Sequence, residues 1–283
     1  ARRTGAQPLV DLSLFQVASF RWGTLLMTFV SFAMFGLFFV APQYFQDVRG
    51  ATPLGSGLRL LPLVGGMLVG MVAGGRLTSP AKLPDGGQGD PPVSAKLAVT
   101  VGFLVMAAGL GIGACTGLGS SMGYAALWIA VTGLGLGIAM PSAMNAAVGP
   151  LTAERSASGG ALMSAVRQVG ATIGVAVLGT LISNGYTSRL HLGGLPSAAA
   201  SAARSSVAGG VEVAQRLGST AMLDEVRSAF IHGMDIMLWA CGGIALASAL
   251  LALAFLPRRF APADDAPAEP AGSSVPGEAQ LRT

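Results

Sequence analysis

The stretch LAVTVGFLVMAAGLGIGACTGLGSSMGYAALWIAVTGLGLGIAMPSAMNAAVGPLTA, from Leu97 to Ala153, contains no Asp, Glu, Lys or Arg. A segment rich in Gly and Ser, from Thr116 to Gly123, divides it into two apolar pieces. The hydrocarbon core of a bilayer is about 30 Å thick and a helix rises about 1.5 Å per residue, so roughly 20 uncharged residues make one crossing. The stretch therefore predicts two consecutive membrane-spanning helices.

The composition of the whole chain favours the same class. Of its 283 residues, 52% are hydrophobic and 11% are charged, whereas soluble domains carry about 25% charged residues. The mean hydropathy is +0.64. The net charge of +4 does not indicate nucleic-acid binding, because the Lys and Arg residues lie mainly at the ends of apolar segments. We expect a lipid bilayer around the protein and no nucleic-acid partner.

The apolar segments predict an all-α integral membrane domain, residues 22–256, with six crossings. The predicted spans are 22–46, 53–77, 97–115, 124–148, 157–185 and 230–256. The connecting and terminal segments are predicted to be a cytoplasmic or interfacial lead-in at 1–21, a cytoplasmic loop at 78–95, an outer loop with short amphipathic helices at 187–229, and a disordered cytoplasmic tail at 257–283.

The distribution of basic residues predicts the orientation in the membrane. With both ends in the cytoplasm, most Lys and Arg residues near span ends lie inside, and the outer hairpin between the third and fourth spans has none. We therefore expect both ends to be cytoplasmic, in a plasma membrane of bacterial type. The chain begins with Ala and an interfacial stretch, so we also expect further sequence upstream.

Glycine recurs at four-residue spacing in four of the predicted spans. Small residues stacked on one helix face let two backbones approach closely in lipid, although membrane helices are rich in glycine in general. The expected packing residues are Gly66, Gly70, Gly74, Gly109, Gly113, Gly133, Gly137, Gly170 and Gly174. Proline within a helix removes a backbone hydrogen bond and kinks it. The expected kinks lie at Pro42, Pro62 and Pro141.

Charged and polar side chains at membrane depth are rare and mark candidate pathways for a substrate or protons. Arg59 and Arg167 should point into the bundle or a wet cavity, or snorkel to an interface. Gln168 follows Arg167 directly. Asn145 follows the expected kink at Pro141, where a helix-end role is favoured over a ligand contact.

Asp235 is the only acid inside a predicted span. A carboxylate shielded from water resists ionisation and can carry a proton. His232 lies three residues earlier, so the two side chains can share one helix face. The alternative is that Ile236 to Leu256 already crosses the hydrocarbon and leaves Asp235 at the wet outer interface.

Four stretches of the sequence together resemble a known family. They are PLVDLSLF from Pro8, SGLRLLPLVGGMLVGMVAGGRL from Ser56, GLGLGIAMP from Gly133 and TAERSASGGALMSAVRQVGATIGVAVLGTL from Thr152. They are similar to the carboxyl-terminal portion of the fourteen-span drug:proton antiporters of the major facilitator superfamily. One departure is clear: the family often follows GRL with an acidic residue, whereas this chain continues with Thr78 and Ser79. A charge-paired cytoplasmic latch is therefore not expected in this half.

The resemblance implies a function and an architecture. The six helices would form one half of a transporter, made of two three-helix repeats, and would face an absent amino-terminal half across a central cavity. The implied activity is proton-driven export of small hydrophobic or cationic molecules by alternating access, as in multidrug resistance. The proton gradient would supply the energy, and no cofactor is expected.

Two other classes of function remain open at this stage. The first is a membrane subunit, or a half-transporter partner, that binds other chains without transporting. The second is an intramembrane hydrolase with Ser56 or Ser120 as nucleophile and His191 or His232 as base, which would need nucleophile and base within hydrogen-bond reach. We expect neither catalytic residues nor a metal site, since two histidines and scattered acids form no recognisable ligand set.

Overall fold

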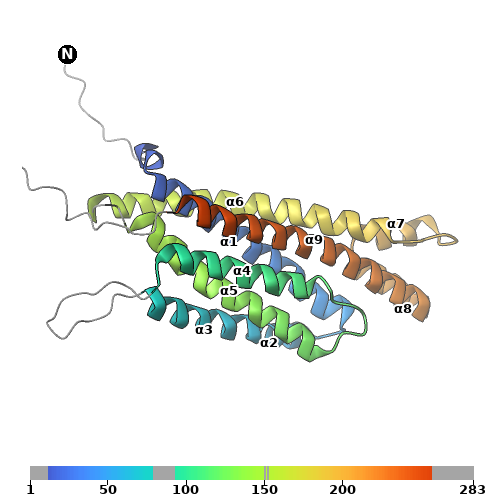
Figure 1. The fold of residues 1–283 in the computed structure, drawn as a ribbon. Coiled ribbons are helices and arrows are strands. Elements are labelled where there is room, and N and C mark those ends of the chain that lie inside the picture. The colour runs from blue at the N-terminus through green and yellow to red at the C-terminus, as the bar shows by residue number, and fades with distance from the viewer. Residues whose placement is uncertain (1–11, 79–92, 150, 152, 257–283) are drawn as a thin grey trace, which may run out of the picture.

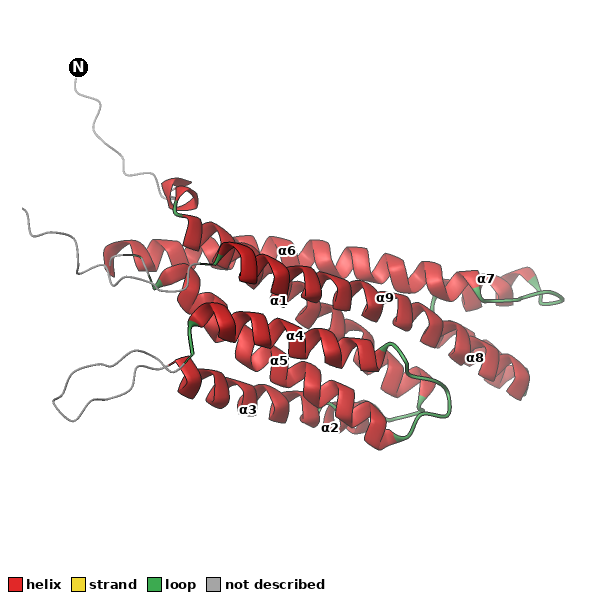
Figure 2. Cartoon of the chain, in the orientation of Figure 1, coloured by secondary structure: helices red, strands yellow, loops and turns green. Residues whose placement is uncertain are grey.

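The computed structural model describes residues 12–78, 93–149, 151 and 153–256. The described residues are helical and contain no strand (Figure 2). Six helices in this part of the chain are long and apolar enough to cross a membrane, which confirms the predicted all-α membrane fold. The tail at 257–283, most of the loop at 78–95 and the first half of the lead-in at 1–21 lie outside the described residues.

The helices run along a common direction in two layers, with α1, α6 and α9 above and α3, α4 and α5 below (Figure 1). The short helices α7 and α8 lie at the end of the bundle that we call the α7–α8 end. The elements are η1 Leu12–Gln16, α1 Ala18–Gln43, the π-helical turn η2 Tyr44–Val48, α2 Pro53–Arg59, α3 Leu61–Thr78, α4 Ala95–Gly113, α5 Met122–Val148, α6 Ala153–Ser188, α7 Ser197–Ser205, α8 Val207–Arg216 and α9 Thr220–Phe255.

Hydroxyl side chains define where five helices begin. In each case the side-chain oxygen accepts a hydrogen bond from the backbone N–H three residues later, which satisfies one of the free donors of the first turn. The donor–acceptor distances lie between 3.0 and 3.3 Å. The capping residues are Thr52 for α2, Ser94 for α4, Ser121 for α5, Ser206 for α8 and Ser219 for α9.

The second predicted span, 53–77, is not one continuous helix. The structure divides it at Leu60 into α2 and α3, and Pro62 lies in the first turn of α3. Pro62 has no N–H to donate to the carbonyl of Leu58, and its ring would clash with that carbonyl in an unbroken helix. The interruption lies two residues before Pro62, where the sequence predicts a kink, and Pro53–Thr78 as a whole remains one candidate span.

The two other prolines lie within helices. Pro141 is inside α5, which continues to Val148. Pro42 is in the last turn of α1, directly before the five residues of η2, whose hydrogen bonds are π-helical. A wider turn of this kind is a common way to accommodate a missing donor near a helix end.

Helix ends extend beyond three of the predicted crossings. α1 begins at Ala18 rather than Trp22, α6 runs from Ala153 to Ser188, and α9 begins at Thr220 rather than Phe230. The predicted outer loop at 187–229 accordingly consists of α7, α8 and the first turns of α9. The reason is that bilayer thickness limits only the apolar part of a helix, whereas its solvated ends can continue with charged residues such as Arg21.

The backbones of α3 and α5 touch along a stripe of small residues. A Cβ added at Gly66 or Gly70 would collide with the carbonyl oxygens of Ala130 and Leu134 on α5. Reciprocally, a Cβ at Gly133 or Gly137 would collide with backbone carbonyls of α3. Any larger side chain at these positions would push the two helices apart.

The GLGLG segment places its three glycines on two sides of α5. Gly133 and Gly137 face α3, whereas a Cβ at Gly135 would lie within 2.7 Å of the backbone of Gly102 and Met106 on α4. Gly109 and Gly113 of α4 meet Thr132 and Trp128 of α5 in the same way. The segment therefore packs α5 between two neighbours, α3 and α4.

The arrangement of the helices follows the expected division into two three-helix repeats. The middle helix of the first set, α3, packs chiefly on α5, which opens the second set, and the middle helix of the second set, α6, packs on α1, which opens the first. The third helices, α4 and α9, pack on each other. On α6, Gly170 and Gly174 give room for Thr28 and Phe32 of α1.

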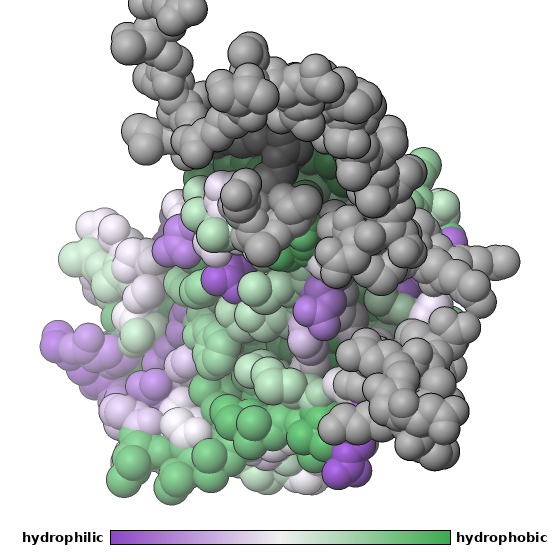
Figure 3. Space-filling view, turned by 90° about the vertical axis from the view of Figure 1, so that its left-hand side faces the viewer, coloured by the Kyte–Doolittle hydropathy of each residue, from purple (hydrophilic) through white to green (hydrophobic). Residues whose placement is uncertain are grey.

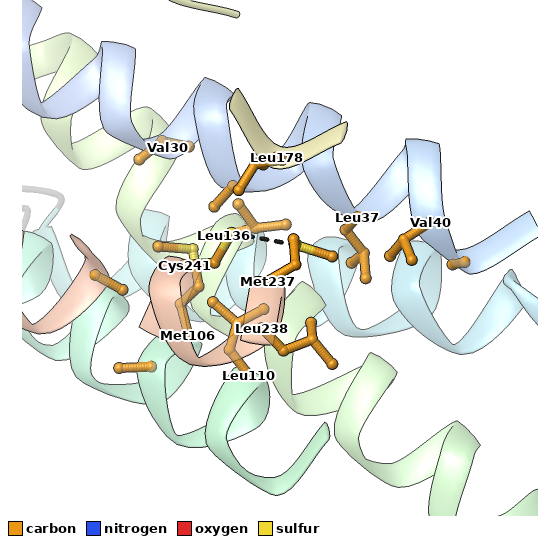
Figure 4. Close-up of a cluster of buried hydrophobic side chains, with 14 of the residues drawn as sticks. Val30, Leu37, Val40, Met106, Leu110, Leu136, Leu178, Met237, Leu238 and Cys241 are labelled. Atoms are coloured by element: carbon orange, nitrogen blue, oxygen red, sulfur yellow. Dashed lines mark hydrogen bonds between the residues drawn. The ribbon is translucent and has the colours of Figure 1, made fainter. Parts of the chain in front are cut away.

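Apolar side chains from five helices meet between the two layers (Figure 4). Leu136 of α5 and Leu178 of α6 are each fully buried there, and Leu178 occupies the space left by Gly36 of α1. The thiol of Cys241 donates to the sulfur of Met237, one turn away on α9, at 3.6 Å. This core holds the two layers together without a polar contact between helices.

The α3–α5 stripe predicts an asymmetric response to alanine within one helix. Gly70→Ala should lower the free energy of unfolding by roughly 1–3 kcal/mol, because the new Cβ overlaps the Leu134 carbonyl and lies 3.1 Å from the Cα of Gly137. Gly65→Ala on α3 is the matched control, since its Cβ would meet no atom within 4 Å. Unfolding midpoints in detergent measure both, and equal effects would contradict the packing.

Candidate functional site

Two membrane helices remain largely unpacked. In the most apolar stretch of each span, 17% of the residues of the second span and 22% of those of α6 are buried. In the other four spans the buried share is 44% to 56%. The open face of α3 is apolar, with Leu68, Val69 and Val72 exposed. Figure 3 shows hydrophobic side chains along the lower margin of the molecule, where α3 lies in Figure 1. This surface is suited to lipid or to another apolar helix.

The open face of α6 differs, because polar side chains run along it beside the exposed Val169, Ile173 and Val177. Thr172 and Thr180 donate to the backbone carbonyls one turn earlier, at 3.0 and 2.9 Å, and keep their lone pairs free to accept. A helix face lined with hydroxyl and amide groups is costly against lipid and favours a protein or water neighbour. The exposed polar residues are Ser164, Gln168, Thr172, Thr180, Ser183, Asn184 and Thr187.

Arg167 projects from α6 on the side toward α1. It is partly buried. On the helical wheel it lies at the edge of the bundle-facing side, about 40° from Met163 and about 60° from Gly170 in one direction and about 60° from the exposed Ser164 in the other. Among the described residues, its guanidinium has no ion pair or hydrogen bond. A partly buried guanidinium with five free donors needs acceptors from water, from a substrate or from another chain segment. Its neighbour Gln168 lies on the polar face.

Arg59 lies far from Arg167. The last turn of α2 carries it over the ring of Phe45, with 5.9 Å from the guanidinium carbon to the ring centroid. Its Nη1 atom is buried without a hydrogen-bond partner, and so are the hydroxyls of Ser56 and Tyr44. Phe45 follows α1, whereas Arg167 lies about one turn before Gly170, which meets Thr28, and is therefore level with the second turn of α1. The two arginines are thus separated by roughly 30 Å along the bundle.

Asn145 lies in the last turn of α5 and is exposed. Its backbone carbonyl accepts the N–H of Gly149 at 2.8 Å, which closes the helix. The nearby Ala147 touches Gly23 of α1, so Asn145 lies in the same half of the bundle as Arg167. The structure thus brings these two predicted residues to a similar depth on different helices and keeps Arg59 apart from them.

Asp235 lies in α9 near the end of α4. It is partly buried, and its Oδ1 atom is buried without a partner among the described residues. The indole nitrogen of Trp128 on α5 is also buried and unpaired. Leu238, one turn after Asp235, and Trp128 both approach Gly113 of α4. An unpaired acceptor and an unpaired donor therefore lie on the helices that pack around the end of α4.

The residues of the hydrolase alternative are not assembled. The Ser120 hydroxyl accepts the N–H of Gly117 at 2.8 Å, and the backbone N–H of His191 donates to the Glu225 carboxylate at 2.6 Å. Neither Ser56 nor Ser120 is hydrogen-bonded to a histidine within the described part of the chain. That part also holds no group of three His, Cys, Asp or Glu side chains that could bind a metal.

Sequence reasoning missed the polar face of α6 and the buried, unpaired groups of Ser56, Tyr44 and Trp128. The first had a signal, because Ser164, Gln168, Thr172 and Thr180 are spaced by multiples of four. The second had none, since only the neighbours in space decide whether a polar atom is paired.

The fold, with six spans in two three-helix sets, defines a half-bundle of a membrane transporter. No protein-family model matches the sequence. The tetracenomycin C resistance and export protein of Streptomyces glaucescens is 32% identical to the chain over 257 residues, covering 87% of this chain and 46% of that protein. The multidrug efflux pump LfrA of Mycolicibacterium smegmatis is 30% identical over 253 residues, covering 86% of this chain and 47% of that protein.

A solved structure shares the fold. It is a bacterial homologue of the human lysosomal transporter Spinster in an inward-facing and unoccupied conformation, with a TM-score of 0.62 at 16% identity over 92% of this chain and 54% of that one. The chain belongs to the major facilitator superfamily, and its relatives are drug-resistance exporters, as the sequence motifs indicated. It spans about half the length of the curated relatives it matches.

The unpaired guanidinium of Arg167 generates a prediction for the full-length transporter. Arg167→Ala should reduce transport by about ten-fold or more, because it removes a charged donor inside the bundle. Arg189→Ala, an exposed arginine just beyond α6, is the control and should transport normally. Transport is measured per molecule inserted in the membrane. Normal transport by both variants would show that Arg167 only snorkels to an interface.

Proposed function

We propose that this chain is the carboxyl-terminal half of a proton-driven exporter of small hydrophobic or cationic molecules. The observation that carries the proposal is the pair of open faces on α3 and α6, the equivalent middle helices of the two three-helix sets. A complete six-helix protein would be expected to bury such faces or to make both apolar. The hydroxyl and amide groups on part of the open face of α6 instead suit a partner half or a water-filled path.

The proposed mechanism is a movement of this half against an amino-terminal half. The backbone contacts of α5 with α3 and α4 make the three helices a stiff unit, which is what rigid-body rocking requires. Arg167, Gln168 and Asn145 would lie near the path at the end of the bundle opposite to α7 and α8. The relatives are named as an export protein and a multidrug efflux pump, which supports transport out of the cell.

We also propose that the protein lies in the plasma membrane with both ends in the cytoplasm. The beginning of α1 and the end of α9 lie at the same end of the bundle, as an even number of crossings demands (Figure 1). Arg21, Arg76 and Lys96 lie near that end, which supports a cytoplasmic location under the positive-inside rule.

An accessory role is the second candidate, because the same open faces could bind partner chains without transport. The test is reconstitution in proteoliposomes, oriented by labelling a cysteine placed at Ser201, which the proposal puts outside. The full-length protein should couple efflux of a cationic aromatic dye to a pH gradient. This chain alone should give no dye-dependent proton flux. Flux from the chain alone would contradict the half-transporter proposal, and none from either protein would favour the accessory role.

Asp235 provides a separate prediction about protons. If its buried carboxylate oxygen receives a proton during transport, Asp235→Asn in the full-length protein should flatten the dependence of export on outside pH. Asp224→Asn, on the exposed first turns of α9, is the control and should keep the parent profile. Superimposable profiles for all three proteins would place the proton pathway elsewhere.

A further inference from the structure

A pocket of about 230 Å³ lies at the α7–α8 end, between α1, α6, α9 and the α7–α8 junction. Its apolar walls include Phe39 and Phe230, and its polar lining includes Arg204 and Gln43. The predicted path through the membrane does not include these residues. The pocket is therefore a feature of the fold that the proposed function leaves unexplained.

The pocket is held open by a buried hydrogen bond. The hydroxyl of Tyr186, which is 3% exposed, donates to the backbone carbonyl of Ala203 at 2.7 Å and lies 3.4 Å from that of Ser206. Gly210 lets α8 approach closely, since a Cβ there would lie 2.6 Å from the Tyr186 hydroxyl oxygen. These contacts attach the α7–α8 junction to α6, so the wall formed by the junction has a defined position.

The polar lining carries a positive charge. Arg204 is the only charged residue among the lining residues. It is exposed, and its guanidinium has no ion pair or hydrogen bond among the described residues. Guanidinium groups recognise planar acids such as carboxylates through two parallel hydrogen bonds. Asp47 does not line the pocket, although its negative charge acts on the Tyr186 hydroxyl. The charge within the lining is that of Arg204, which favours an anion.

The first turn of α8 adds a partial positive charge at the pocket. Ser206 and Val207 line the pocket, and Val207 is the first residue of this ten-residue helix. The Ser206 side chain accepts the N–H of Gly209 at 3.0 Å, which leaves the N–H groups of Val207 and Ala208 without partners within the helix. A helix N-terminus beside an unpaired arginine is a favourable place for a negative group.

The apolar lining indicates the body of the ligand. Phe39 is 40% exposed and offers its ring to the pocket, with Phe230, Ile182 and Val207 as further walls. Gly179 adds no side chain beside the Phe39 ring. Pockets for drug-sized ligands measure roughly 300–1,000 Å³, so this smaller volume suits a body of one or two aromatic rings.

We propose that this pocket binds a small aromatic anion, with the acid group at Arg204 and the first turn of α8, and the rings against Phe39 and Phe230. The same chemistry, an anionic head on an apolar body, also belongs to an anionic lipid. The inference concerns binding alone and stands whether or not the chain takes part in transport.

The test uses the full-length protein in nanodiscs of neutral phosphatidylcholine. Ligand-observed saturation-transfer NMR compares three probes of one shape: 1-naphthoate, neutral 1-naphthamide and cationic 1-naphthylmethylammonium. Naphthoate should bind most tightly. Arg204→Gln should weaken its binding by about ten-fold, and Gly179→Leu should abolish it by filling the pocket, since a Cβ at Gly179 lies 3.8 Å from the Phe39 ring and fits without a clash.

Arg216→Gln is the matched control. Arg216 is an exposed arginine of α8 that is paired with Glu212 and does not line the pocket, so naphthoate binding should be unchanged. Nanodiscs with phosphatidylglycerol separate the two sources of ligand: competition with naphthoate that Arg204→Gln removes identifies a lipid, and absence of competition identifies a free anion. The proposal would be overturned if neither Arg204→Gln nor Gly179→Leu changed the binding of naphthoate, or if the cationic probe bound more tightly than naphthoate.

Discussion

The contact between the backbones of α3 and α5 is the interaction on which the rest of the packing depends. Burial of apolar surface does not drive helices together in lipid, because lipid tails are as apolar as leucine. Close van der Waals contact must do so, and it requires glycine where Gly70 and Gly137 meet. Gly135, on another side of α5, brings in α4. α4 in turn packs on α9, which joins the two layers.

This packing has a consequence for function. Because α3 uses its glycine face against α5, its opposite face is left with exposed Leu68, Val69 and Val72. α6, the equivalent helix of the second set, uses Gly170 and Gly174 against α1 and leaves a polar face open. The two open faces differ in chemistry although the helices are equivalent in position. That difference fits a half-bundle in which one face meets apolar surface and the other a wetter environment.

Some charged and polar side chains have no hydrogen-bond or ion-pair partner within the described part of the chain. Arg167 has donors without acceptors at the level of the second turn of α1, and Asp235 has a buried acceptor without a donor in α9. Arg204 offers an unpaired charge to a pocket at the α7–α8 end. Of these three groups only the Oδ1 atom of Asp235 is fully buried, so it alone pays the full cost of an unpaired polar atom unless water, a ligand or a partner pairs with it.

The sequence by itself determined the membrane class, the six crossings and the residues able to bring helices together. These properties depend on local quantities, namely apolar length against bilayer thickness and the spacing of glycines along one helix. The superfamily was also readable, because its motifs lie in continuous stretches around Arg59, Gly137 and Arg167.

Tertiary structure alone decided which faces meet and which side chains gather. The break at Leu60, the pairing of α3 with α5, the separation of Arg59 from Arg167 and the pocket under Tyr186 all depend on residues distant in sequence. No local period encodes such contacts, because a helix with small residues on several sides can pack in more than one way. Which of these packing arrangements forms depends on the contacts of all the helices together.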